Sequence, residues 1–121
     1  MKMKSLILQL FLILSSSILF GQTFYSLDEA KKHPEKVVEL MLYRNGLKII
    51  PSEIYEFENL VVLNLAENEI TEIPADIAKL KKLETLELNG NSLTSVHPNI
   101  KKLKQLKKLN LNGCDFSTIP N

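Results

Sequence analysis

The chain has 121 residues, of which 45% are apolar, so it is long enough for one small domain with a hydrophobic core. Its formal net charge is +1, which excludes a strong charge-driven attraction to nucleic acid or to an anionic membrane surface. Cys114 is the single cysteine, so no disulfide can form within the chain and packing must hold the fold together.

The first 21 residues have the layout of a secretory signal peptide. Two lysines precede an apolar run over residues 6–20, which is shorter than the roughly 20 apolar residues that span a membrane. We therefore expect residues 1–21 to be removed, leaving no stable membrane span, and the mature protein to be periplasmic, cell-surface associated or secreted, in the style of an exported bacterial protein. Cleavage after Gly21 or after Ser17 fits this layout, and retention as an anchor is the alternative.

Residues 22–36 are expected to form an N-terminal helical cap, with a short helix over about 27–33. Ser26 and Glu29 have the spacing of a capping box, which marks a helix start. Pro34 marks the end of that helix, because proline lacks the backbone N–H that a helix interior needs. The apolar residues expected to pack on the first unit of the following segment are Phe24 and Leu27.

From residue 37 onward the sequence repeats with a period of 23 residues. The units span 37–59, 60–82, 83–105 and, incompletely, 106–121, and they open with Val37, Leu60, Leu83 and Leu106. One unit is too small to fold alone, so the four are expected to stack on one another. The further apolar positions that share this period are Leu40, Leu63, Leu86 and Leu109; Leu42, Leu65, Leu88 and Leu111; Leu47, Ile70, Leu93 and Phe116; Ile50, Ile73, Val96 and Ile119; Ile54, Ile77 and Ile100; and Phe57, Leu80 and Leu103.

The pattern L-x-x-L-x-L-x-x-N/C-x-L runs through all four units, with Val37 in place of the first leucine and with Ile70 and Phe116 in place of the last. It resembles the repeat of the leucine-rich-repeat (LRR) family, and the 23-residue spacing with Ile-Pro after the motif is similar to its typical subclass. The resemblance covers residues 37–121. It implies an α/β solenoid, a short curved right-handed stack with a parallel β-sheet on the concave face and short helical or 3-10 turns on the convex face.

The ninth position of each repeat is expected to form a structural ladder. A side-chain amide there can satisfy backbone groups of its own turn and of the next turn, which would otherwise be buried without partners. The residues at this position are Asn45, Asn68, Asn91 and Cys114. The thiol of Cys114 is a weaker hydrogen-bonding group, so the last rung is expected to be the weakest.

The resemblance implies that a protein or peptide ligand meets the outward strand positions of the concave sheet. Tyr43, Arg44 and Met41 are the strongest candidate contacts, because these residue types are enriched at interfaces. The alternative is that the outward residues are merely solvated. The full candidate set is Glu39, Met41, Tyr43, Arg44, Val62, Asn64, Glu67, Thr85, Glu87, Asn89, Lys108, Asn110 and Asn112.

A second hypothesis concerns the C-terminal end of the stack. Leu106, Leu109, Leu111 and Phe116 would have one uncovered side, and solenoids usually need a polar capping repeat there. The chain would then be a structural subunit or fragment that docks onto another repeat protein or onto a second copy.

The residues give no support for catalysis, a cofactor or a bound metal. His33 and His97 fall on different faces, without acidic or cysteine neighbours at ligand spacing, and Cys114 is assigned to the ladder. The basic run 101–108 alternates with core leucines and lacks the aromatic residues that would stack bases, so it is interpreted as solvated repeat surface and not as a nucleic-acid site.

Overall fold

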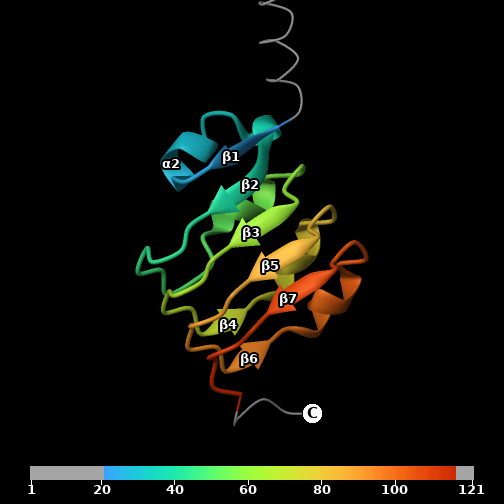
Figure 1. The fold of residues 1–121 in the computed structure, drawn as a ribbon. Coiled ribbons are helices and arrows are strands. Elements are labelled where there is room, and N and C mark those ends of the chain that lie inside the picture. Colours follow the sequence, from blue (N-terminus) through green and yellow to red (C-terminus); the bar gives the residue numbers. More distant parts are fainter. Residues whose placement is uncertain (1–20, 117–121) are drawn as a thin grey trace, which may run out of the picture.

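The computed structural model describes residues 21–116 as one stack of parallel strands (Figure 1). The main sheet has the order β1 (Gln22–Phe24), β2 (Val37–Met41), β3 (Val62–Asn64), β5 (Thr85–Glu87) and β7 (Lys108–Asn110). A second sheet pairs β4 (Glu72–Ile73) with β6 (Ser95–Val96). All of the expected signal segment except Gly21 lies outside the described residues, and so does the predicted apolar position Ile119.

The register of the main sheet follows the sequence period. Glu39 of β2 pairs with Val62 of β3, which pairs with Thr85 of β5, which in turn pairs with Lys108 of β7. Every partner is thus the residue at the same position in the next repeat. Rows of equivalent side chains therefore run across the sheet, alternating between the core and the solvent.

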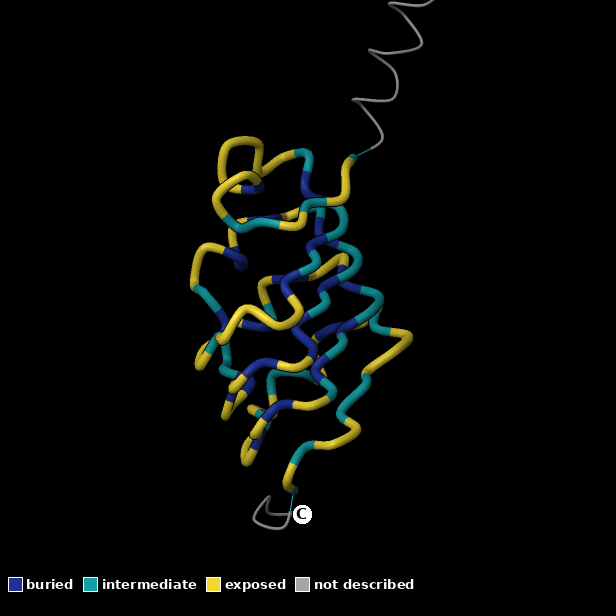
Figure 2. Tube along the Cα trace, turned by 60° about the vertical axis from the view of Figure 1, so that its left-hand side comes forward, coloured by how far each residue is buried: buried dark blue, intermediate teal, exposed yellow. Residues whose placement is uncertain are grey.

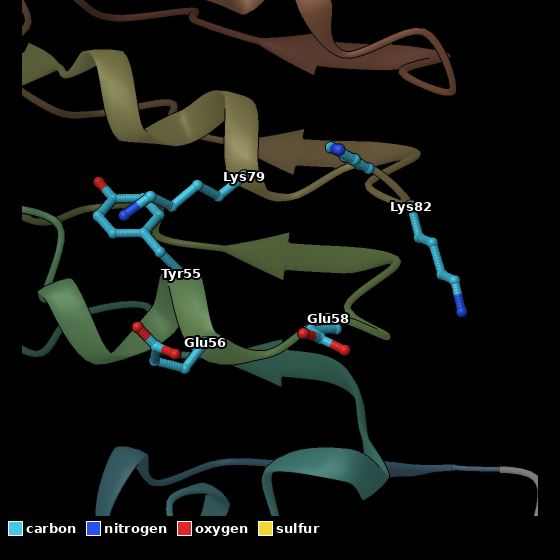
Figure 3. A pocket seen from close by; sticks show the side chains of 6 residues that line it. Tyr55, Glu56, Glu58, Lys79 and Lys82 are labelled. Carbon is cyan, nitrogen blue, oxygen red and sulfur yellow. The ribbon is translucent and has the colours of Figure 1, made fainter.

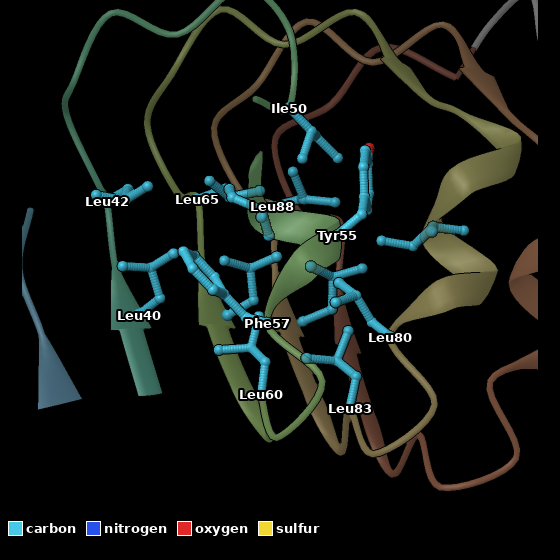
Figure 4. Packing of buried hydrophobic residues seen from close by; sticks show 14 of the residues in the cluster. Leu40, Leu42, Ile50, Tyr55, Phe57, Leu60, Leu65, Leu80, Leu83 and Leu88 are labelled. Atoms are coloured by element: carbon cyan, nitrogen blue, oxygen red, sulfur yellow. The ribbon is translucent and has the colours of Figure 1, made fainter. Parts of the chain in front are cut away.

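The return segments opposite the sheet contain one 3-10 turn in each of the first three repeats, as the LRR resemblance implies. Prolines lie at the start of these turns, where a fixed φ suits the conformation and no N–H is required. The turns are η2 (Ser52–Glu56), η3 (Ala75–Lys79) and η4 (Pro98–Lys102). Figure 4 shows core side chains filling the space between the strands and these turns.

The hydrophobic core runs the length of the stack (Figure 2). Every predicted apolar position of the first three repeats is buried or half-buried, which confirms the repeat-based assignment of the core. The fourth repeat differs, because Leu106, Leu111 and Phe116 are only half-buried and Leu109 is 39% exposed.

The N-terminal segment differs from the predicted helical cap in two ways. Gln22–Phe24 forms β1, which pairs in parallel with β2 and adds a strand to the sheet. The helix α2 covers only Leu27–Ala30 and not 27–33, while η1 (Pro34–Lys36) follows it. After Ala30 the backbone hydrogen bonds tighten to a spacing of three residues, from Lys32 N–H to the Glu29 carbonyl and from His33 N–H to the Ala30 carbonyl. His33, which precedes Pro34, has left helical backbone, with φ −141° and ψ 61°. The Ser26 hydroxyl accepts a hydrogen bond from the Glu29 backbone N–H, as the capping pattern predicts.

Asparagine side chains connect the turns that follow the strands. Asn68 Oδ1 accepts from the backbone N–H groups of Asn45 and Leu47, and Asn68 Nδ2 donates to the carbonyls of Leu42 and Leu65. Asn68 and Asn91 therefore each serve their own turn and the preceding turn, and not the following turn that was expected from the sequence. The side chains bond to the preceding turn because the backbone N–H groups of that turn lie beyond the sheet and need an acceptor.

The two ends of this ladder are weaker than its middle. Asn91 Oδ1 accepts from Ile70 N–H and Asn91 Nδ2 donates to two carbonyls, whereas Cys114 Sγ donates one bond of 3.3 Å to the Leu88 carbonyl. Asn45 is exposed, has no earlier LRR turn to serve, and uses its amide on the carbonyl of Tyr43.

Candidate functional site

The sheet face, defined as the outward side of β2, β3, β5 and β7, presents eight of the thirteen predicted candidates in two rows, and the other five follow the ends of these strands. In the first row, the Glu39 carboxylate has a partner within the fold, because the Thr23 hydroxyl of β1 donates a 2.6 Å hydrogen bond to it. Glu87 in the second row forms an ion pair with Lys108, and the hydrogen bond from Lys108 lowers the pKa of Glu87. These polar groups largely satisfy one another across neighbouring strands.

Several other candidates have structural partners. Asn64 Oδ1 accepts from the Ala66 N–H, and Asn110 Oδ1 accepts from the Asn112 N–H, so both side chains stabilise the turn at the end of their own strand. Met41, Val62, Thr85 and Asn89 are half-buried, and Asn112 is exposed.

The eighth position of every repeat adopts left-handed backbone. Gly90 and Gly113 have φ of 71° and 72° there, while Arg44 and Glu67 have φ of 56° and 54°. Glycine adopts this conformation freely, but a residue with a Cβ is strained in it. Two repeats thus use the residue that suits the backbone, and two repeats carry a long charged side chain in its place.

Arg44 and Glu67 contact each other across the first two repeats. Arg44 Nε donates to Glu67 Oε2, and this hydrogen bond together with the charge of Glu67 raises the pKa of Arg44. Tyr43 lies next to Arg44 in the chain and is 52% exposed. We refer to Tyr43, Arg44 and Glu67 as the exit cluster, because all three follow the ends of strands β2 and β3.

The exit cluster is limited to the first two repeats, because Gly90 and Gly113 have no side chain at the same position of the third and fourth repeats. A Cβ placed on Gly90 would lie 3.2 Å from Glu67 Cγ, which is tighter than ordinary packing. The glycine therefore leaves room for the Glu67 side chain, and no side chain continues the row in the third or fourth repeat.

The structure separates the other titratable candidates. His97 Nδ1 accepts from the Asn99 N–H at 3.1 Å and so caps η4. Within residues 21–116, no three His, Cys, Asp or Glu side chains gather as metal ligands. The basic run is divided, since Lys101 and Lys102 lie in η4 whereas Lys108 lies on the sheet face in β7.

Two features of this site are not apparent from the repeat pattern of the sequence. The strain at Arg44 and Glu67 was not anticipated, although Gly90 and Gly113 at the same repeat position were a usable signal for left-handed backbone. Thr23 was placed in a cap and not in the sheet, so its bond to Glu39 had no sequence signal.

Comparisons with known proteins agree with this architecture. A family model described as leucine rich repeat matches residues 58–116. No curated protein sequence matches the chain. Among residues 21–116, no helix has the length and apolar character needed to cross a membrane.

Solved structures of similar fold include two LRR proteins. An LRR protein of Leptospira interrogans has 22% identity and a TM-score of 0.47, over 83% of this chain and 37% of that chain. The LRR ectodomain of the plant membrane receptor kinase GASSHO1/SCHENGEN3 from Arabidopsis thaliana, in complex with CASPARIAN STRIP INTEGRITY FACTOR 2, has 27% identity and a TM-score of 0.56. That alignment covers 78% of this chain and 12% of the ectodomain, so the chain spans only a small part of its neighbours' length. The 23-residue period, the stacked parallel strands and the family model that matches residues 58–116 together show that the chain folds as a leucine-rich-repeat solenoid.

Proposed function

We propose that this chain is a non-catalytic module that binds a protein or peptide through the sheet face, with the exit cluster as its anchor. LRR domains generally mediate protein–protein interaction, which supports the general role. The particular anchor rests on one observation, the charged side chains held in left-handed backbone at Arg44 and Glu67.

A comparison of free energies indicates that these two charged side chains do not serve to stabilise the fold. Left-handed backbone costs a residue with a Cβ about 1–2 kcal/mol. An exposed ion pair stabilises a protein by about 0–1 kcal/mol, so the pair between Arg44 and Glu67 does not offset the strain of two residues. Glycine at the same position of the other repeats shows that the fold needs neither side chain. Strained residues of this kind are often found where a side chain serves binding.

The exposed groups indicate the chemistry of the partner. The hydrogen bond from Arg44 to Glu67 uses Nε, and the described residues give its two terminal nitrogens no hydrogen-bond partner. Their paired N–H groups fit a carboxylate, while the exposed ring of Tyr43 offers an apolar contact beside it. The expected ligand segment thus carries an acidic group next to an apolar or aromatic side chain.

Export of the protein is part of the proposal. The signal-like residues 1–21 support it, and the similar ectodomain from Arabidopsis belongs to a membrane receptor. The proposed site of action is the periplasm, the cell surface or the surrounding medium. A fusion to a reporter that is active only after export tests this, because replacing the two N-terminal lysines and the apolar run should abolish the signal.

A peptide library displayed on phage and selected on the purified protein tests the binding proposal. Affinities of the selected peptides are then compared for the wild type, Tyr43→Ala and Arg44→Ala, with Lys102→Ala on the opposite face as a matched control. We expect Arg44→Ala to weaken binding at least about tenfold, as for a binding hot spot, and the control to leave it unchanged.

The end-docking alternative makes a different prediction, which concerns association of the chain with a second copy. Leu109 is 39% exposed at the last described strand, and it favours association of this end with a second copy. If Leu109→Ser abolishes association while the Tyr43 and Arg44 variants bind normally, the sheet-face proposal is wrong.

A further inference from the structure

An asparagine followed by a glycine occurs in three of the turns that follow the strands of the main sheet. The pairs are Asn45-Gly46, Asn89-Gly90 and Asn112-Gly113. Such a pair is chemically reactive, because the glycine nitrogen can attack the carbon of the asparagine side-chain amide and no glycine side chain shields it. The attack requires that the glycine N–H loses its proton and that the asparagine amide turns towards the nitrogen. A hydrogen bond from either group therefore protects the pair.

The three glycines have nearly the same backbone conformation, so hydrogen bonding is what distinguishes the pairs. Their φ values are 65° at Gly46, 71° at Gly90 and 72° at Gly113. Gly90 N–H donates a 2.8 Å hydrogen bond to the Asn112 carbonyl, and Asn89 is half-buried, so the attacking nitrogen of this pair is protected. Asn45 Nδ2 donates a 2.9 Å hydrogen bond to the Tyr43 carbonyl, which holds the side-chain amide of this pair.

In the third pair, both reacting groups are free. Asn112 and Gly113 are exposed, and within residues 21–116 neither the Asn112 side chain nor the Gly113 N–H has a hydrogen-bond partner. The backbone of Asn112 is nevertheless held in place. Its N–H donates to Asn110 Oδ1, and its carbonyl accepts from Gly90 N–H. The turn thus fixes the asparagine and leaves its side chain free to meet the next nitrogen.

Asparagines outside these pairs are protected more fully, as Asn59 illustrates. Its Nδ2 donates to the Glu35 carbonyl and its Oδ1 accepts from Lys82 Nζ, and Figure 3 shows the Lys82 side chain extending from its own loop. The next residue is Leu60, whose N–H donates to the Phe57 carbonyl. Both reacting groups of Asn59 are therefore bonded, and a leucine side chain flanks the nitrogen.

We propose that Asn112 is a site of spontaneous deamidation. The Gly113 nitrogen loses its proton to a solvent base and attacks Asn112 Cγ. A C–N bond forms, the bond from Cγ to Nδ2 breaks, and ammonia leaves, which gives a cyclic imide. One water molecule then opens the ring at either carbonyl carbon. The product is an aspartate or, when the backbone runs through the former side chain, an isoaspartate.

The modification changes both charge and geometry at the end of the stack. Either product replaces a neutral amide by a carboxylate directly after β7. The isoaspartate also lengthens the backbone two residues before Cys114, whose thiol makes one 3.3 Å hydrogen bond in the last rung of the ladder. This inference does not depend on the proposed binding function, because it concerns the chain and water alone.

The test is incubation of the folded full chain in neutral buffer made with heavy-oxygen water, followed by peptide mapping with mass spectrometry. Incorporated heavy oxygen counts the conversions that occur during incubation. We expect Asn112 to react about threefold to tenfold faster than Asn45, because at Asn45 one hydrogen bond must first break. Asn112 should react at least about tenfold faster than Asn89, which also requires local opening of the turn.

Asn89 is the matched comparison, since both it and Asn112 lie between a leucine and a glycine in the sequence. In urea, where the hydrogen bonds of the fold are absent, these two asparagines should therefore react at similar rates. Asn112→Gln should remove the conversion at position 112 and leave the rates at Asn45 and Asn89 unchanged. The proposal is overturned if Asn112 reacts no faster than Asn89 in the folded chain, if Asn45 reacts faster than Asn112, or if the difference from Asn89 persists in urea.

Discussion

The left-handed backbone at Arg44 and Glu67 predicts an inverted preference between alanine and glycine. At most positions an alanine variant is more stable than a glycine variant, because glycine has more conformational freedom in the unfolded chain. At φ of 56° and 54° the order should reverse, since alanine retains the Cβ that causes the strain. Both substitutions remove the ion pair between the two residues equally, so it cancels from the comparison.

The expected magnitude follows from two opposing terms. Relief of left-handed strain favours glycine by about 1–2 kcal/mol, and the freedom of the unfolded chain opposes it by about 0.4–1 kcal/mol. Glycine should therefore exceed alanine by about 0.5–1 kcal/mol at position 44 and again at position 67. Such a difference raises the melting temperature by several degrees in a domain of this size.

Urea denaturation of the paired variants measures this difference. Tyr43 is the control, because its φ is not positive, and Tyr43→Ala should be more stable than Tyr43→Gly by about 0.4–1 kcal/mol. Arg44→Gly should also lose affinity for the selected peptides while the fold is at least as stable as in Arg44→Ala. If alanine is as stable as glycine at both left-handed positions, the strain argument for the exit cluster is refuted.

Three further predictions follow from the hydrogen bonds and titratable groups. Asn68→Ala should destabilise the fold by about 2–4 kcal/mol in urea denaturation, because several backbone groups lose their partner, whereas Asn45→Ala should cost less than about 1 kcal/mol. The folded pKa of Tyr55, about 12, exceeds the ordinary value of about 10, so the associated stability is complete below pH 10 and is lost between pH 10 and 12. This loss should be absent in Tyr55→Phe, which should be at least as stable as the wild type at neutral pH. The pKa of Glu87 is lowered from its ordinary value of 4.5, so the associated stability is present above that pH and is lost as the pH falls through the folded pKa. Lys108→Met should therefore differ from the wild type in stability more at pH 7 than at pH 3.

The repeated part of the fold could be predicted because it follows from the spacing of residues alone. The row of Leu40, Leu63 and Leu86 points into the core in the first three units, and the partner of each strand is its equivalent in the next unit. The turns opposite the sheet follow from the proline after each motif. No long-range information is needed where every unit contacts only its neighbours.

The features that depart from the 23-residue repeat could not be predicted from the spacing of residues. Gln22–Phe24 carries no copy of the motif, so its addition to the sheet depends on the open edge of β2 and not on its own pattern. Tyr55 is buried in η2, an element that contacts η3 of the next repeat, and the strain at Arg44 and Glu67 arises from a backbone conformation set by the whole turn. Direct partners such as Thr23 for Glu39 depend on a side chain from another strand.

The central claim is that a partner binds the sheet face at the exit cluster. Chemical-shift mapping of the labelled protein with a selected peptide tests it most directly, because it reports every backbone amide at once. The largest chemical-shift changes are expected at residues 41–44 and 64–67, with little change in η2, η3 and η4. Changes confined to residues 106–111 at the exposed end of the stack would contradict it.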